Sequence, residues 1–166
     1  MTRNSETVID QINEWIGRTV SWLSLALVLI IVGDVFLRYA FSITSSASFE
    51  LEWHLFAVIF LLSAGWALGK DKHVRVDVFY SQFTPRGKAI VNVTGTVLLL
   101  LPLCVVGFME GVQFVQNSYL LRETSPDPGG LPARYLVKSA IPIGFALLGL
   151  QGLSEILKGF KVLVGK

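Results

Sequence analysis

The chain has 166 residues, of which 52% are hydrophobic and only 16% are charged, and its mean hydropathy is +0.60. A soluble domain carries about 25% charged residues. The charges here gather between long apolar runs, which argues against a soluble fold and for a membrane protein with several spans. The net charge of +2, without a long run of Lys or Arg, argues against nucleic-acid binding.

Residues 1–16 place apolar side chains at helical spacing beside polar ones, which predicts a short amphipathic helix. This segment either lies on the membrane surface or in a partner's groove, or it extends the first span into water. The apolar block from Val20 to Phe41 is longer than the core of a signal peptide, so we expect a retained span over residues 17–41. Within it, Asp34 and Arg38 lie four residues apart, where they can pair on one helix face.

Three further spans are expected over residues 50–69, 89–116 and 136–157, because each is apolar and close to the 20 or so residues that cross a bilayer. A short loop of small polar residues, 42–49, separates the first two spans. Pro102 lies in the middle of the third span and predicts a kink there.

Residues 70–88 join the second and third spans and contain the most densely charged stretch of the chain. A strand would leave open edges in lipid, so we expect a turn followed by an amphipathic surface helix. With Arg38 and Lys138 left out, ten Lys and Arg residues lie in this loop and toward the two ends of the chain, against two in the other loops. The positive-inside rule then places both termini and this loop in the cytoplasm.

Residues 1–166 are therefore predicted to form a single membrane domain of the all-α class. It has four transmembrane helices plus short amphipathic surface helices, and both termini are cytoplasmic. The loops over residues 42–49 and 117–135 then face the other side of the membrane.

The loop over residues 117–135 is rich in proline and glycine, which exclude helix and force turns. Such a stiff loop suits either a binding surface or a rigid connector. Its central residues are Ser125, Pro126, Asp127, Pro128, Gly129 and Gly130.

The predicted orientation gathers a cluster of polar residues in the outer half of the membrane. Such residues mark either a proton or ion path or an internal network that locks the helices together. We favour the network, because we expect the inner halves of the second, third and fourth spans to be apolar. The predicted cluster comprises Asp34, Arg38, Glu50, Glu52, Glu110 and Lys138.

The sequence shows no sign of an enzyme. Cys104 is a lone cysteine in an apolar run and is expected to serve in packing. His54 and His73 lie at opposite ends of the second span, which does not suit haem, and no nucleotide-binding or hydrolase motif is present. We therefore expect no catalytic residue, cofactor or metal ion in this chain.

Three motifs, taken in order, resemble the small membrane (Q-type) subunit of tripartite ATP-independent periplasmic, or TRAP, transporters. They are Asp34-Val-Phe-Leu-Arg38 closing the first span, Glu50 and Glu52 opening the second, and His73-Val-Arg75-Val-Asp77 after it. The opening of the second span departs from the family pattern, so no ion-pair partner is inferred for Glu50 or Glu52.

The resemblance implies a scaffold subunit in a bacterial inner membrane. It would support a large, elevator-type transmembrane subunit that carries the substrate and sodium sites. It would also help dock a periplasmic substrate-binding protein for sodium-driven uptake of an organic acid, either a carboxylate or a sulfonate. The residues Ser125 to Gly130 would form the docking loop, and His73, Arg75 and Asp77 would form a cytoplasmic anchor motif.

The residues themselves leave a rival hypothesis open. The chain could instead be a self-sufficient small transporter that assembles as a homo-oligomer and uses Asp34, Glu52 and Glu110. In that case transport would need no second membrane subunit.

Overall fold

The computed structural model describes residues 7–70, 80 and 83–164. All regular structure in these residues is helical, which confirms the predicted all-α class. Within them, four helical stretches are long and apolar enough to cross a membrane, as expected. These stretches are Val8–Phe41, Ser46–Gly69, Pro85–Leu120 and Tyr135–Val164.

Helix α1 (Val8–Phe41) joins most of the N-terminal amphipathic segment and the first predicted span into one continuous helix of 34 residues. Its start is fixed by a capping box, in which the Thr7 side chain accepts a hydrogen bond from the Asp10 amide and the Asp10 side chain accepts one from the Thr7 amide. The helix ends at Ser42, whose φ of 55° lies in the left-handed region. At 1.5 Å per residue, α1 is roughly 50 Å long.

Helix α2 (Ser46–Gly69) begins earlier than the predicted boundary at residue 50. The Ser45 hydroxyl caps it by accepting a hydrogen bond from the Ser48 amide at 3.3 Å. The predicted polar loop over residues 42–49 therefore shortens to a tight connection, and Glu50 stands one turn inside the helix.

The third span is a composite of α4 (Pro85–Gly95), a π-helical turn η2 (Thr96–Leu100) and α5 (Leu101–Leu120). The turn lies just before Pro102, which has no amide hydrogen to continue the regular ladder. The Leu101 amide bonds the Thr96 carbonyl, five residues back. The irregularity predicted at the proline is thus a widened turn that precedes it.

The fourth span comprises the short helix α6 (Tyr135–Lys138) and α7 (Ala140–Val164). The break between them falls at Ser139, three residues before the buried Pro142, which again lacks an amide donor. Helix α7 continues beyond the predicted end at residue 157.

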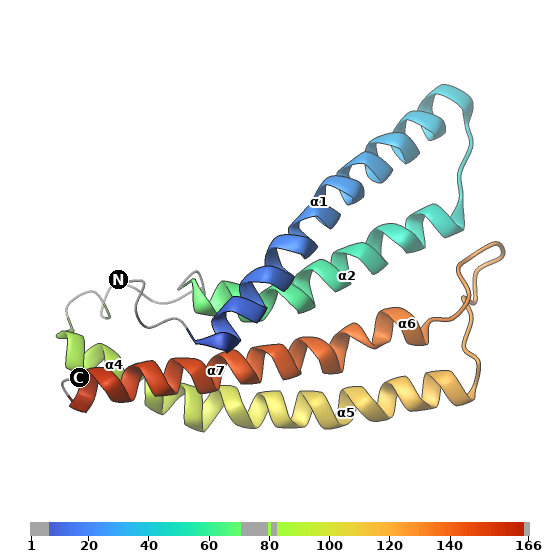
Figure 1. Ribbon diagram of the computed structural model, residues 1–166. Helices are drawn as coiled ribbons and strands as arrows, with labels where there is room; N and C mark the ends of the chain where they lie inside the picture. Colours follow the sequence, from blue (N-terminus) through green and yellow to red (C-terminus); the bar gives the residue numbers. More distant parts are fainter. Residues whose placement is uncertain (1–6, 71–79, 81–82, 165–166) are drawn as a thin grey trace.

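Helix α7 is the centre of the packing, with α2 on one side and α5 on the other (Figure 1). Close approach depends on small residues, as is usual between membrane helices. A Cβ added at Gly144 would lie 2.7 Å from the Leu61 carbonyl oxygen, and one at Gly107 would lie 2.6 Å from the Phe145 ring. Helix α1 packs on α2 and then diverges from the other helices (Figure 1).

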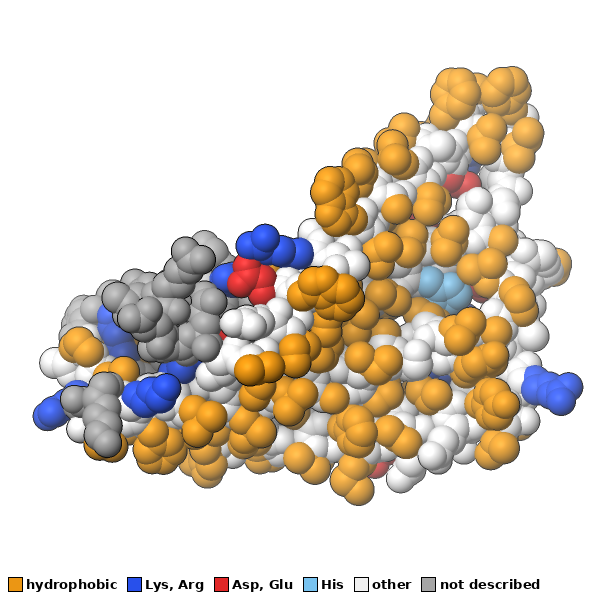
Figure 2. Space-filling model, viewed as in Figure 1, with side chains coloured by type: hydrophobic (Ala, Val, Ile, Leu, Met, Phe, Trp, Pro, Cys, Tyr) orange, Lys and Arg blue, Asp and Glu red, His pale blue; other side chains and the backbone are white. Residues whose placement is uncertain are grey.

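The ends of the molecule differ from its flanks in the side chains that they carry. The start of α1, the end of α2 and the end of α7 lie at one end, and the loops that follow α1 and α5 lie at the other (Figure 1). Figure 2 shows hydrophobic side chains along the flanks of the helices, with most of the charged side chains toward the ends. This is the distribution that a bilayer imposes on a multi-span protein.

Candidate functional site

Two polar clusters lie at opposite ends of the helices. The first ties the proline-rich loop to α2, and we call it the loop anchor; its members are Glu50, Glu123, Ser125, Leu131, Arg134 and Lys138. The second ties the start of α1 to α7, and we call it the basal cluster; its members are Asp10, Asn13, Gln151, Ser154 and Lys158.

The proline-rich loop is closed by its own backbone hydrogen bonds. The Ser125 amide donates to the Leu131 carbonyl at 3.1 Å, and the Arg134 amide donates to the Glu123 carbonyl at 3.1 Å. Gly129 takes a φ of 77°, which glycine adopts without strain. Together with the fixed φ of the prolines, these bonds give the loop a defined shape.

Glu50 joins the base of this loop to α2. Its carboxylate accepts hydrogen bonds from the Ser125 hydroxyl and, at 2.6 Å, from the Leu131 amide. The residue is only 3% exposed, so its charge depends on these donors. A Cβ at Gly130 would lie 2.9 Å from the same carboxylate, which explains why the smallest residue stands there.

Glu123 closes the other side of the loop anchor. Its carboxylate pairs with the Lys138 ammonium, and an Arg134 guanidinium nitrogen lies 3.9 Å away. The same guanidinium lies 4.0 Å from Glu50 and over the ring of Trp53. The hydrogen bond from Lys138 lowers the pKa of Glu123 below its ordinary value.

The lowered pKa of Glu123 predicts an acid-sensitive loop. Ionised Glu123 stabilises the fold at pH values above its ordinary pKa of 4.5, and this contribution is lost as the pH falls through its lower pKa in the folded state. The melting temperature of Glu123→Gln should therefore be below that of wild type at pH 7, and the difference should vanish in acid. Asp127→Asn is the control, because Asp127 is exposed and takes part in no ion pair among the described residues. A Glu123→Gln difference that stays constant with pH would contradict the assignment.

The six residues of the predicted docking loop separate into two groups. Ser125 and Gly130 are half-buried at the loop anchor. The residues between them, 126–129, are exposed at the tip of the loop. The fold therefore holds a rigid tip away from the helices.

The structure brings only some members of the predicted outer cluster into contact with other polar groups. Of its six members, the loop anchor contains only Glu50 and Lys138, and these two do not pair with each other. Among the described residues, Asp34 and Arg38 form no ion pair, and Arg38 lies over the Tyr39 ring instead. The C-terminal half of α1 diverges from the bundle, so no neighbouring helix encloses its charges. Glu52 and Glu110 likewise form no hydrogen bond or ion pair with the described residues.

The basal cluster was not predicted. Lys158 Nζ lies 2.7 Å from Asp10 Oδ1, and the Gln151 amide donates to the same oxygen at 2.6 Å. Asn13 donates to Gln151 Oε1 at 3.0 Å and is 2% exposed, while Gln151 is fully buried. The inner half of the fourth span is thus polar on one face, contrary to the expectation that it is apolar.

A sequence signal for the basal cluster does exist. Gln151, Ser154, Glu155 and Lys158 recur at helical spacing and so share one face of α7. The sequence analysis considered the membrane surface, a partner's groove or an extension into water for residues 1–16, whereas Asp10 and Asn13 contact α7 of the same chain. For the loop anchor the signal is weaker: Glu123 and Arg134 flank a short closed loop, whose ends must lie close together.

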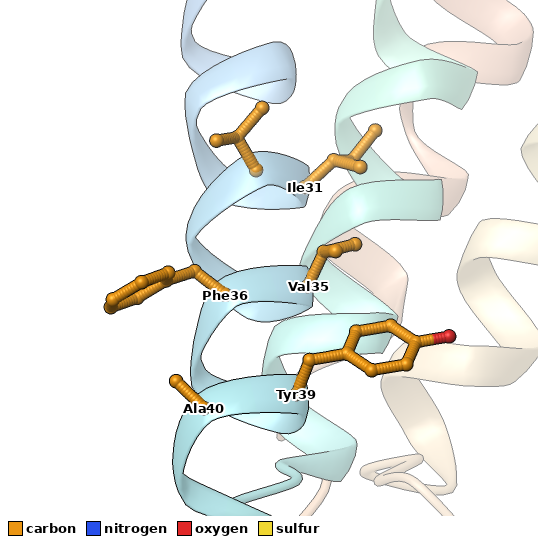
Figure 3. Close-up of a pocket in the computed structure, with 6 residues that line it drawn as sticks. Ile31, Val35, Phe36, Tyr39 and Ala40 are labelled. Atoms are coloured by element: carbon orange, nitrogen blue, oxygen red, sulfur yellow. The ribbon is translucent and has the colours of Figure 1, made fainter.

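The C-terminal half of α1 offers a different kind of surface. A shallow depression there is lined by side chains of this helix alone, and Figure 3 shows them projecting from it. Except for the Tyr39 hydroxyl they are apolar, so the depression suits acyl chains or an apolar protein surface. Its residues are Ile31, Val32, Val35, Phe36, Tyr39 and Ala40.

The remaining candidate residues give no further site. The cytoplasmic anchor motif, His73, Arg75 and Asp77, lies outside the described residues. Lys70, just before it, pairs with Glu14 of α1 at 2.9 Å. Across the described part of the chain, no three His, Cys, Asp or Glu side chains converge as metal ligands.

Comparison with known proteins identifies the family. Residues 27–162 match the family described as tripartite ATP-independent periplasmic transporters, DctQ component. No curated protein matched the chain. The match runs from just past the middle of α1 to the last turn of α7, and so includes the loop anchor. It describes a component of a transporter rather than an enzyme. The chain therefore belongs to the DctQ family, the small membrane subunit of TRAP transporters.

Proposed function

We propose that this subunit is a scaffold, which supports a large elevator-type transport subunit and presents the proline-rich loop to a periplasmic substrate-binding protein. The observation that carries this proposal is the loop anchor. A loop whose base is fixed by Glu50 and Glu123, and whose tip over residues 126–129 is exposed, is preorganised for contact with another protein.

The distribution of polar groups supports a scaffold rather than a channel within this chain. The loop anchor and the basal cluster lie near opposite ends of α2 and α7. Between them, residues 55–68 of α2 are apolar or small apart from Ser63, over roughly 20 Å of helix. Helix α7 meets this stretch through Gly144 against Leu61. A polar substrate would find no continuous set of partners there.

The proposal includes an orientation and a transport role. We infer that the loop anchor faces the periplasm and that both termini are cytoplasmic, on the basis of the asymmetry of Lys and Arg. The partner subunits would carry out sodium-driven uptake of a carboxylate or sulfonate across a bacterial inner membrane. In this scheme the sodium sites belong to the large subunit.

Removal of the Glu50 carboxylate tests the proposal. In a complex with its large subunit and binding protein, Glu50→Ala should strongly reduce uptake and weaken capture of the binding protein, because the base of the loop loses its acceptor. Glu50→Gln keeps one acceptor oxygen and should lose less. Both activities are measured per amount of assembled complex.

Glu52→Ala is the matched control. Glu52 lies two residues further along α2 and bonds to none of the described residues. If Glu50→Ala and Glu52→Ala behave alike, the loop anchor has no role in docking. Uptake by this chain alone in liposomes would reject the scaffold and favour the self-sufficient transporter.

A further inference from the structure

One face of α5 carries polar side chains that no described residue satisfies. Its exposed residues recur three or four positions apart and so form one stripe along the helix. The neighbouring face, with Cys104, Gly111 and Ser118, is buried in the fold. We call the exposed set the α5 stripe; it consists of Leu103, Val106, Glu110, Gln113 and Asn117.

Glu110 lies within the third span. It precedes the end of α5 at Leu120 by ten residues, or about 15 Å of helix, and the predicted end of the span at residue 116 by six, or about 9 Å. Its neighbour Gly111 packs against Ile141 and Pro142 of α7, well inside the fourth span. In Figure 2, acidic atoms interrupt the hydrophobic surface along α5, away from both ends of the molecule.

An exposed carboxylate at this depth calls for a protein neighbour. Ionisable residues within membrane spans almost always face protein or water and pair with an opposite charge or a donor. Among the described residues, Glu110 forms no hydrogen bond or ion pair. The side-chain amides of Gln113 and Asn117, which lie further along α5 toward the loop anchor, also need hydrogen-bond partners.

The part of the chain that the structure describes offers no cation for Glu110. Among the described residues, Lys138 is paired with Glu123 and Lys158 with Asp10. Arg38 lies near the end of α1, in the part that diverges from the bundle, and α1 does not pack on α5. A second copy of the chain, packed through the same face about a two-fold axis, would bring two Glu110 carboxylates together, which is unfavourable.

We propose that the α5 stripe is the surface on which a transmembrane helix of the large subunit packs, and that this helix directs a Lys or Arg toward Glu110. The inference rests on the proposed pairing with a large subunit. Leu103 and Val106 provide the apolar part of the contact, while Gln113 and Asn117 provide hydrogen-bonding groups.

Photo-crosslinking tests which face of α5 the large subunit covers. Val106 and Val105 are adjacent valines with similar exposure, 59% and 56%, but Val105 points away from the stripe. In the assembled complex, benzoylphenylalanine at position 106 should give an adduct with the large subunit, and at position 105 it should not. An adduct with a second copy, equal adducts at both positions, or no protein adduct at position 106 would each overturn the assignment.

Substitution of Glu110 tests its chemistry. Glu110→Leu should reduce recovery of the large subunit with this chain by about tenfold or more, since the partner's cation loses its carboxylate. Glu110→Gln should be intermediate. Gln116→Leu, an exposed change elsewhere on α5, should have no effect. Recovery of Glu110→Leu equal to or above wild type would show a lipid-facing carboxylate and overturn the proposal.

Two measurements keep the outcomes distinct. The melting temperature of purified Glu110→Leu without its partner should match that of wild type, which separates lost pairing from misfolding; a lowered value would overturn the assignment. If the wild-type chain recovers no large subunit, the proposed function fails. If it does recover the large subunit while position 106 gives no adduct, only the assignment of this face fails.

Discussion

Gly144→Val should separate α2 from α7 and lower the free energy of unfolding by about 3 kcal/mol. A Cβ at this position would lie 2.7 Å from the Leu61 carbonyl oxygen and 3.0 Å from its carbon. These are backbone atoms, which cannot rotate away as a side chain would. The whole interface must therefore open, and α1, which packs on α2, must move with it.

Gly33→Val is the control for this change. Gly33 lies on the exposed part of α1, and an added Cβ meets nothing within 4 Å. Both variants add the same β-branched residue to a helix, so the difference between them isolates the contact with Leu61. Unfolding of the purified chain in increasing SDS gives the comparison. Similar unfolding midpoints would mean that α2 and α7 do not approach as closely as the structure has them.

Gln151→Leu should cost about 2 kcal/mol or more, although it adds an apolar residue to an apolar span. The fully buried Gln151 amide accepts from Asn13 and donates to Asp10. Leucine would leave the buried Asn13 amide only its longer contacts to the Ile9 and Leu147 carbonyls, at 3.3 and 3.5 Å, and would remove one donor from Asp10. Weakened hydrogen bonding of buried polar groups is expensive. Because the cluster joins α1 to α7, the loss should appear as exposure of the N-terminal part of α1 to protease.

Gln11→Leu provides the comparison, since Gln11 lies near the same end but is exposed. A second check is the double variant Asn13→Leu with Gln151→Leu. Removing both partners should cost less than the sum of the single changes, because neither amide is then left alone. Additive costs would contradict a direct bond between them.

The four spans could be predicted from the sequence because length and hydropathy are local properties. Their boundaries were less predictable. Ser45 and Thr84 cap helices earlier than the apolar runs suggest, and α1 starts as soon as Thr7 can cap it. The helical spacing within residues 1–16 correctly indicated a helix there. Hydropathy could not show that this helix continues into the first span without a break.

The contacts of the polar residues depended on information that the sequence does not contain. Glu50 and Leu131 are 81 positions apart, so their bond follows from how α2 and the loop meet in space. Asp34 and Arg38 have the spacing of a pair, yet spacing only permits an ion pair. Since α1 diverges there, Arg38 lies over Tyr39. Family resemblance supplied the role of the chain but none of these contacts.

The π-helical turn over Thr96–Leu100 changes the direction in which the later side chains of the third span point. One extra residue in a turn rotates everything after it by about 100° relative to a regular helix. Ala89 of α4, before the turn, and Cys104 of α5, after it, are both buried in the fold. Deleting a single residue here would turn Glu110 toward a different neighbour. The number of residues in this segment therefore matters as much as their identity, because it sets the direction of Glu110. This holds although none of its five side chains is buried.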